Sequence, residues 1–513
     1  MPPRDAPRAT SAPPADAAPP GPAARPGAAA PLVLGFGLLA AISLPLFVFF
    51  GSARFSLLAR LCGWLGLLSS LLPGLWLLTR RRALSCSVVA FGLWMALFCH
   101  LAVLHADRLL LRWGEARLSE PSVDLALLYA GLAVPAMWLG WAAAGPLGAA
   151  RAMPRLRLSV PQGALRTAGA VLVLLSLLAD ALWLRGLLPL QQPWVGLITV
   201  LLPGDLGFAM VLLSSLVGER EPRAQAKLAS SLSSSLFWAL FAAAAVVALM
   251  RGVLSALVKP LLIYLLGWLL VRRRLRLWPV LAALFAVVLL QPVKAEFRAR
   301  VWDRQSTLSL GERVALYLDL TAQHWLGGET APVVDRERAV QAAASRASAA
   351  LQLAHVVELT PASVPYQGGA TYRYLRYALI PRLLMPDKPI AQHADVWAAV
   401  VYGYTTQSGT AHVMVGLSQL AEAYVNFGLL GGLLVLALCG ALFRLIDELL
   451  AHPRAAAGAL ALHLYFVQNV TLAFEGSLAN FWGGVLQQLV VYGVALALLG
   501  RLSQAGGVAA AGR

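Results

Sequence analysis

The sequence predicts an all-α polytopic membrane protein. Of its 513 residues, 59% are hydrophobic and only 13% are charged, whereas about 25% of the residues of a soluble protein are charged. Apolar runs long enough to cross a hydrocarbon core of ~30 Å recur along most of the chain. The runs are continuously apolar and do not alternate, which excludes a β-barrel. Together these observations exclude a soluble enzyme and a disordered chain.

The elements are predicted in order from these runs. Residues 1–30 are rich in Pro and Ala and lack the apolar core of a signal peptide, so we expect a disordered cytoplasmic tail. Nine transmembrane helices are expected within 31–292 and three within 421–500, followed by a second cytoplasmic tail at 501–513. The twelve apolar segments are 31–50, 56–78, 84–104, 123–143, 166–184, 193–217, 232–250, 253–271, 277–291, 421–443, 456–473 and 481–500.

The basic residues predict the orientation of these helices. With both termini in the cytoplasm, the short inner loops carry sixteen Lys and Arg, against eight in the short outer loops and helix ends. Such an excess is typical of the cytoplasmic side of a membrane protein. It also accounts for the net charge of +17, and no basic stripe with interleaved aromatic residues predicts nucleic-acid binding.

One connection, residues 293–420, is far longer than the others and lies on the outer side in this topology. It contains nine Trp and Tyr residues between 302 and 404, too many aromatic residues for a linker, so we expect it to be folded. Helices are predicted at 308–325, at 335–358 between an Asp335 cap and Pro361, and at 369–380 before Pro381. We expect any chemistry to reside here.

Basic residues of this loop are candidates for binding a lipid diphosphate. Arg373 and Arg376 share one face of a helix, and Arg382 and Lys388 follow closely. Arginine offers planar paired donors and lysine a point charge, which suits phosphate oxygens. The alternative is that these side chains are interfacial anchors for ordinary anionic membrane lipids. Arg346 points either into a cavity or into solvent.

Candidate proton acceptors are fewer. Glu422 lies one to two turns inside the tenth segment, and His412 lies where the loop re-enters it; a salt bridge to a loop arginine is the alternative role for Glu422. His324, His355 and His393 are interpreted as ordinary loop histidines. Three further ionisable residues lie within or beside apolar segments, and Asp205 and Lys259 either have a functional role or pair with each other. The third is Glu475.

No metal or cofactor is predicted. The four cysteines all lie in apolar segments without metal or redox spacing, and no Walker A motif is present. The first outer loop (51–55) lacks the acidic pair with which many lipid-sugar-dependent glycosyltransferases bind a metal.

Residues 345–430 resemble the Wzy-type O-antigen and exopolysaccharide repeat-unit polymerases. The resemblance rests on an ordered set of phrases: SRASAALQL, TPASVPYQGGATYRYLRYALIPRLLMPDKP and LAEAYVNFGLLGG. The run KAEFR (294–298) and the run FEGS (474–477) also fit. About a fifth of the chain is covered at the level of residues, and the rest agrees in architecture.

The resemblance implies a GT-C-like, metal-independent glycosyltransferase in the bacterial inner membrane. It would polymerise oligosaccharide repeat units linked to undecaprenyl diphosphate at the periplasmic face, with a chain-length regulator as a partner. By position it assigns diphosphate binding to the loop cations, the base to Glu422 or His412, and substrate contacts to a further set of residues: Tyr366, Tyr372, Tyr424, Arg298 and Glu475.

Two other functions remain open. An O-antigen-type ligase would move finished glycan from the lipid carrier with the same loop chemistry. A transporter or flippase of lipid-linked oligosaccharides would do no covalent chemistry. A flippase should line a central cavity with charge, whereas the basic residues here gather in one loop, which favours an enzyme.

Overall fold

The protein is almost entirely helical. The computed structural model describes residues 37–38, 40–45, 48, 56–79, 112–113, 116–188, 198, 201–218, 224–272, 278–302, 308–326, 349–377, 380, 384–385, 387–411, 415–452 and 455–511. Within these ranges the only strands are the two-residue β1 (Arg112–Trp113) and β2 (Ala116–Arg117), which pair antiparallel. The prediction of an all-α protein is confirmed.

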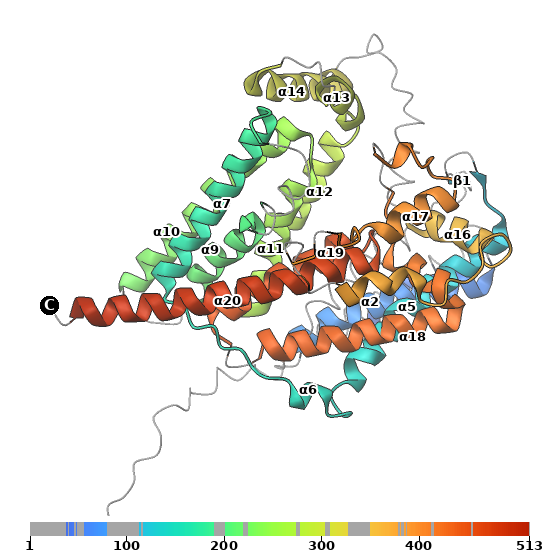
Figure 1. The fold of residues 1–513 in the computed structure, drawn as a ribbon, viewed down its shortest axis with the longest axis horizontal. Helices are drawn as coiled ribbons and strands as arrows, with labels where there is room; N and C mark the ends of the chain where they lie inside the picture. Colours follow the sequence, from blue (N-terminus) through green and yellow to red (C-terminus); the bar gives the residue numbers. More distant parts are fainter. Residues whose placement is uncertain are drawn as a thin grey trace, which may run out of the picture.

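The helices form two bundles (Figure 1). The first bundle consists of α2 (Leu57–Thr79), α5 (Glu120–Ala143) and α18 (Gln419–Leu450), with the short α16 (Ala349–Leu359) packed on α5 and α18. The second bundle consists of α7 (Gln162–Leu184), α9 (Gly204–Gly218), α10 (Ala224–Arg251), α11 (Ser255–Arg272) and α12 (Trp278–Leu290). Between the two bundles lie α19 (Ala457–Ala473) and α20 (Leu478–Ala511).

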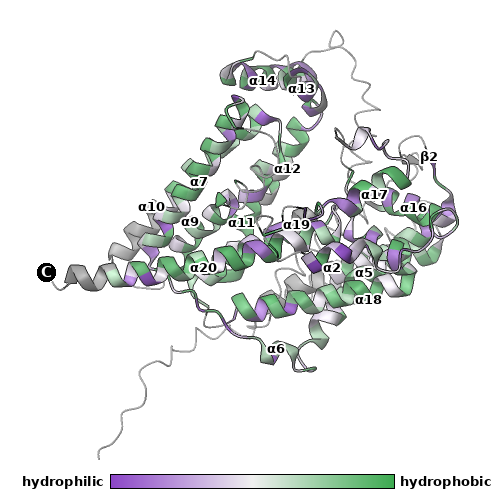
Figure 2. Cartoon of the chain, viewed as in Figure 1, coloured by the Kyte–Doolittle hydropathy of each residue, from purple (hydrophilic) through white to green (hydrophobic). Residues whose placement is uncertain are grey.

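Six described helices are long and apolar enough to cross a membrane, so the chain is a helical, multi-pass membrane protein. These helices are Glu120–Ala143, Gln162–Leu184, Ser233–Arg251, Ser255–Arg272, Gln419–Leu450 and Leu478–Ala505. Figure 2 shows apolar residues along most of their length. The helix α12, which corresponds to the shortest of the predicted spans, has 13 residues in the described part of the chain, or about 20 Å of helix.

Two predicted spans lie wholly or partly outside the described residues. The segment 84–104 is outside the described residues, and only parts of 31–50 are described. Residues 1–30, predicted as a tail, are also outside them.

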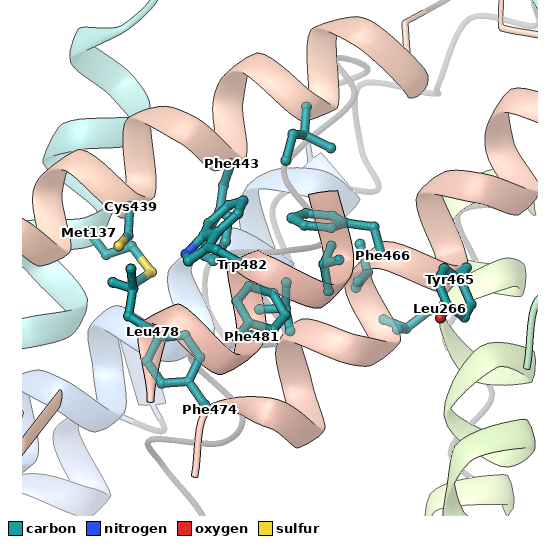
Figure 3. Packing of buried hydrophobic residues seen from close by; sticks show 14 of the residues in the cluster. Met137, Leu266, Cys439, Phe443, Tyr465, Phe466, Phe474, Leu478, Phe481 and Trp482 are labelled. Carbon is teal, nitrogen blue, oxygen red and sulfur yellow. The ribbon is translucent and has the colours of Figure 1, made fainter. Parts of the chain in front are cut away.

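Small residues allow α5 and α18 to pack backbone against backbone. A Cβ on Gly140 would lie 1.8 Å from the carbonyl oxygen of Ala437, and one on Gly440 would lie 2.0 Å from that of Met137. Helices inside a membrane associate by such close van der Waals packing, because lipid is as apolar as the side chains. Aromatic residues of α18, α19 and α20 complete the core beside them (Figure 3): Phe443, Phe466, Phe481 and Trp482.

The described parts of the long connection are folded. Their elements are α13 (Lys294–Val301), α14 (Leu310–Leu326), α16, the 3-10 helix η4 (Ala370–Tyr377), α17 (His393–Val401) and the short 3-10 helix η5 (Gly409–Ala411). The predicted helix at 308–325 is confirmed by α14. It begins with a capping box, in which Glu312 accepts from the Ser309 amide at 2.7 Å and Ser309 accepts from the Glu312 amide.

Two predicted loop helices differ from the observed ones. The helix expected over 335–358 is described only from Ala349, and it ends at Leu359, before Pro361 as predicted. The helix expected over 369–380 is a 3-10 helix that ends at Tyr377. Its arginine pair is spaced by three residues, which is also one turn of a 3-10 helix, so the two side chains still share a face.

Candidate functional site

A cavity of about 340 Å³ lies in the long connection, between η4 and α17. We call it the loop cavity. Its basic and polar lining consists of Arg373, Arg376, His393, Gln367 and Thr371, and its aromatic lining of Tyr374, Tyr377 and Trp397. It therefore combines cations, a titratable imidazole and aromatic faces within one opening.

Asn426 of α18 holds the segment that enters η4. Its side-chain oxygen accepts from the Gly369 amide at 2.8 Å, and its amide group donates to the Thr371 hydroxyl at 2.7 Å. The backbone adds bonds from Gln367 to the Val425 carbonyl and from Gly368 to the Asn426 carbonyl. Because Gln367 and Thr371 line the loop cavity, α18 fixes one wall of it.

A kink in α18 makes this contact possible. Gly428 has φ +66° and ψ −163°, which interrupts the helix one turn after Tyr424. Only glycine adopts this left-handed region without strain. A Cβ here would also lie 3.0 Å from the Tyr366 hydroxyl, so the kink both turns the helix and admits that ring.

Arg373 and Arg376 are exposed cations at the loop cavity, and neither forms an ion pair with any described acidic residue. The guanidinium of Arg376 lies over the Tyr377 ring, 4.6 Å from its centroid. That stacking limits the side chain's freedom without neutralising its charge. The cavity can thus offer an anion two guanidinium groups that no described acidic residue neutralises.

Lys388 has a different environment from the one predicted. Its side chain is 5% exposed, its ammonium donates to the Ile380 carbonyl at 2.8 Å, and it lies 5.3 Å from the centroid of the Tyr374 ring. It supports the ring that lines the cavity but does not line the cavity itself. Arg346, Arg382 and His412, the other predicted site residues of the loop, lie outside the described residues.

Glu422 is fully buried and does not line the loop cavity. Its Oε2 accepts from the amide of Leu478, the first residue of α20, at 2.5 Å. Asp395 binds Ser477, the residue before Leu478. The Asp395 carboxylate accepts from the amide and the hydroxyl of Ser477 at 2.9 and 3.0 Å. The Glu422 and Asp395 side chains therefore both accept hydrogen bonds at the N-terminus of α20, where the amides have no partner within the helix.

Burial raises the pKa of Asp395 above its ordinary value. Four hydrogen bonds to the carboxylate oppose this effect, two of them from Ser477, one from the Leu417 amide and one from Asn480. The carboxylate is enclosed by donors, as an anion that binds a helix end should be. Its neighbours His393 and Ala394 line the loop cavity.

The predicted substrate-contacting residues are dispersed. The ring of Tyr424 lies edge-on to Tyr366 and Tyr129, with centroids 6.3 and 5.6 Å away, and Tyr372 packs on Phe427 at 6.2 Å. All three predicted tyrosines thus surround the first turns of α18.

The two remaining predicted residues lie elsewhere. Arg298 lies on α13 of the long connection, and its Nε donates at 3.0 Å to the carbonyl of Gly252, which follows α10 of the second bundle. Glu475 is exposed after α19 and does not line the loop cavity.

His393 and Trp397 are cavity residues that sequence reasoning did not select. Both lie on α17, four residues apart, and so share a helix face. That spacing is visible in the sequence, but nothing in the sequence shows that this face meets η4. Two other loop histidines have structural contacts, His355 with the Tyr402 carbonyl at 3.0 Å and His324 with the Trp325 ring.

Asp205 and Lys259 pair with each other, as the structural alternative predicts. The Lys259 ammonium lies 3.0 Å from Oδ2 of Asp205, and Arg251 pairs with Asp180 at 2.5 Å nearby. These four residues line a second cavity, of about 400 Å³, within the second bundle. We call it the bundle cavity. Asp205 is in the first turn of α9 and not in mid-helix, since the helix begins at Gly204.

The fold and the site define a multi-pass helical membrane protein whose long inter-helix connection carries a basic, aromatic cavity. Among the described residues no three His, Cys, Asp or Glu side chains are grouped so as to hold a metal ion. The chain belongs to a family described as a domain of unknown function (DUF8712), which matches residues 224–494. No curated protein and no solved structure matches it. The matched range runs from α10 to α20 and includes the loop cavity.

Proposed function

We propose that this protein is a membrane glycosyltransferase that polymerises oligosaccharide repeat units linked to a lipid diphosphate, undecaprenyl diphosphate. The observation that carries the proposal is the loop cavity, in which two arginines without an acidic partner among the described residues, an imidazole and three aromatic rings converge. The resemblance of residues 345–430 to Wzy-type polymerases supports it, since that segment includes η4 and the part of α18 that holds it.

The arginines suit the leaving group of such a reaction. The acceptor hydroxyl oxygen attacks the anomeric carbon of the donor sugar, and the bond from that carbon to the diphosphate breaks. The diphosphate leaves with the electron pair and gains negative charge. Fixed guanidinium groups stabilise that charge as it develops, which lowers the barrier. Arg373 and Arg376 are the side chains that we assign to this role.

The hydroxyl proton needs an acceptor within reach. We assign this role to His393, because it is exposed and lines the same cavity as the arginines. Glu422, favoured by sequence position, is fully buried and its Oε2 binds the α20 amide. We assign Glu422 a positioning role. The aromatic rings of Tyr374, Tyr377 and Trp397 suit the apolar faces of sugar rings.

The remaining parts of the proposal concern location. We propose a bacterial inner-membrane protein with twelve spans in a GT-C-like arrangement, both termini cytoplasmic and residues 293–420 periplasmic. Membrane lipids and a chain-length regulator are the expected partners.

Deleting the gene and resolving the glycan by size, with lipid-linked and exported fractions separated, tests the proposal. We expect a ladder of long chains to collapse to single repeats on the outer face. Full-length chains that stay on the lipid carrier would instead indicate a ligase. An unchanged distribution would refute a role in glycan assembly.

A lipid-linked-oligosaccharide transporter is the second candidate. The observation that favours it is the bundle cavity, where four charged residues lie among membrane helices. Single repeat units trapped on the inner face after gene deletion would support it against the polymerase.

A further inference from the structure

The bundle cavity is a polar space inside an apolar helix bundle. Six helices line it: α7, α9, α10 and α11 of the second bundle, together with α19 and α20. At about 400 Å³ it is within the size range of small-molecule sites, which begins at about 300 Å³. Its charged residues lie in the first or last two turns of α7, α9, α10 and α11, and charged side chains that line a cavity in a membrane protein commonly mark a functional site.

The charges in this cavity cancel. Lys259 is paired with Asp205 and Arg251 with Asp180. Each contact uses one carboxylate oxygen, which leaves the second oxygen of each aspartate as an acceptor. The Arg251 Nε is buried without a hydrogen-bond partner. The cavity thus has donors and acceptors but no net charge, which disfavours an ionic ligand and suits an uncharged, hydroxyl-rich one.

Neutral polar and aromatic groups extend this lining. The Tyr465 hydroxyl donates to Oε1 of Gln488 at 2.8 Å, and Asn469 lies one turn further along α19. Phe208 and Tyr465 add aromatic surface. Mixed hydrogen-bonding groups beside aromatic rings match a sugar, whose hydroxyls both donate and accept and whose C–H faces are apolar.

The backbone is interrupted at the same place. Leu202 and Pro203 lie outside the helix before α9, and both line the cavity. Pro260 of α11 lacks the N–H that would bond the Ala256 carbonyl, and both residues are also part of the lining. Non-helical backbone in a membrane protein is tolerated where it lines a polar cavity, and it marks substrate sites in transporters.

One helix connects the two cavities. In α20, Gly483 contacts the Tyr374 ring of the loop cavity, and Gln488 lines the bundle cavity. These positions are separated by an axial rise of about 7.5 Å. A substrate with a charged group and sugar rings could therefore contact both ends of this short helical segment.

We infer that the bundle cavity binds an uncharged sugar unit of the lipid-linked substrate, with Gln488, Tyr465 and Asn469 as its hydrogen-bonding residues. The identity of the ligand rests on the proposed function. The site itself rests on the lining, the compensated charges and the non-helical step at Leu202 and Pro203 before α9.

Saturation-transfer NMR on the full chain in lipid nanodiscs tests this inference. The probes are the methyl glycosides of glucose, galactose, mannose, rhamnose and N-acetylglucosamine, with inorganic pyrophosphate as the anionic comparison. We expect at least one glycoside to bind saturably. Gln488→Leu should weaken that binding about fivefold, the effect of one lost hydrogen bond. Gln487→Leu, next to it but outside the cavity lining, is the matched control.

Asn469→Leu is a second variant, in case Gln488→Leu does not fold. Absence of saturable binding for every glycoside, or equal binding by wild type and both cavity variants, would overturn the inference. So would displacement of the glycoside by pyrophosphate at equal concentration, since that would show an anion site.

Failure of the inference differs from failure of the proposed function. A collapsed glycan ladder without glycoside binding would refute the cavity assignment alone. An unchanged ladder with glycoside binding that requires Gln488 would refute the polymerase and leave the sugar site in place.

Discussion

The loop cavity and the bundle cavity each contain two basic side chains, but their charges are handled in opposite ways. In the bundle cavity Arg251 and Lys259 each contact an aspartate. In the loop cavity Arg373 and Arg376 are exposed and have no acidic partner among the described residues. An unpaired cation is costly inside a membrane and nearly free in water. The bundle cavity therefore suits a neutral group, whereas the loop cavity can accept an anion.

The double variant Arg373→Ala/Arg376→Ala is the strongest test of this contrast. If both guanidinium groups stabilise the leaving diphosphate, polymer yield should fall at least ~100-fold, as when a fixed transition-state donor is removed. The measurement is the glycan ladder at matched expression. Arg300→Ala is the control, because Arg300 is an exposed arginine of the same connection that is paired with Glu296. Equal loss in both variants would contradict the assignment.

His393→Ala and Glu422→Gln separate chemistry from positioning. Loss of a general base lowers a rate by ~10²-fold or more, so we expect His393→Ala to lower polymerisation at unchanged thermal stability. Glu422→Gln keeps an oxygen that can accept from the α20 amide, so we expect it to retain activity and to lower the free energy of unfolding by no more than about 1 kcal/mol. The measurements are ladder yield and thermal unfolding in detergent. Full activity in His393→Ala would make another group the base.

Single and double variants of the Asp205–Lys259 pair test the other half of the contrast. Lys259→Met or Asp205→Asn leaves one charge unpaired. Loss of a partner in a fully buried pair costs 3–5 kcal/mol, and we expect about 2 kcal/mol at these partly exposed positions. The double variant should recover most of the loss. Thermal unfolding of all four proteins gives the coupling energy, and additive losses would show that the pair is not coupled.

The helix content and one charge pair of the second bundle could be predicted from the sequence. Helix content followed from apolar runs because every backbone group in a membrane must bond within its own helix. The pairing of Asp205 with Lys259 was also foreseeable, because a charged side chain within a membrane-spanning bundle is costly unless it has a partner of opposite charge. The limits of the individual spans were harder to predict. Residues 193–217 were predicted as one continuous span, but α9 begins only at Gly204, after Pro203.

The loop site was predictable in composition but not in arrangement. Arg373 and Arg376 were identified from their spacing, and they line the cavity. Lys388 and Glu422, also selected by residue type, are buried, because whether a charge faces a cavity or supports it depends on tertiary packing. His393 was passed over, since nothing local shows that α17 packs against η4. The contacts that position the site join residues far apart in the sequence, such as Asn426 and Gly369, and local sequence patterns do not predict such contacts.

The smallest expected effect concerns the contact between the loop cavity and α20, where Gly483 packs against the Tyr374 ring. A Cβ on Gly483 would lie 2.7 Å from Cε1 of the Tyr374 ring, whereas Gly484 has open space at the same atom. Gly483→Ala should therefore shift the ring and lower polymer yield severalfold, at a packing cost of about 1 kcal/mol. Gly484→Ala makes the same change in helix propensity without the contact, and we expect wild-type yield. Because α20 also carries Gln488, glycoside binding measured on both variants shows whether the disturbance stays at the loop cavity. If Gly483→Ala weakened glycoside binding as much as Gln488→Leu, the two cavities would be one coupled site, and the contrast between them would have to be replaced by a single substrate path along α20.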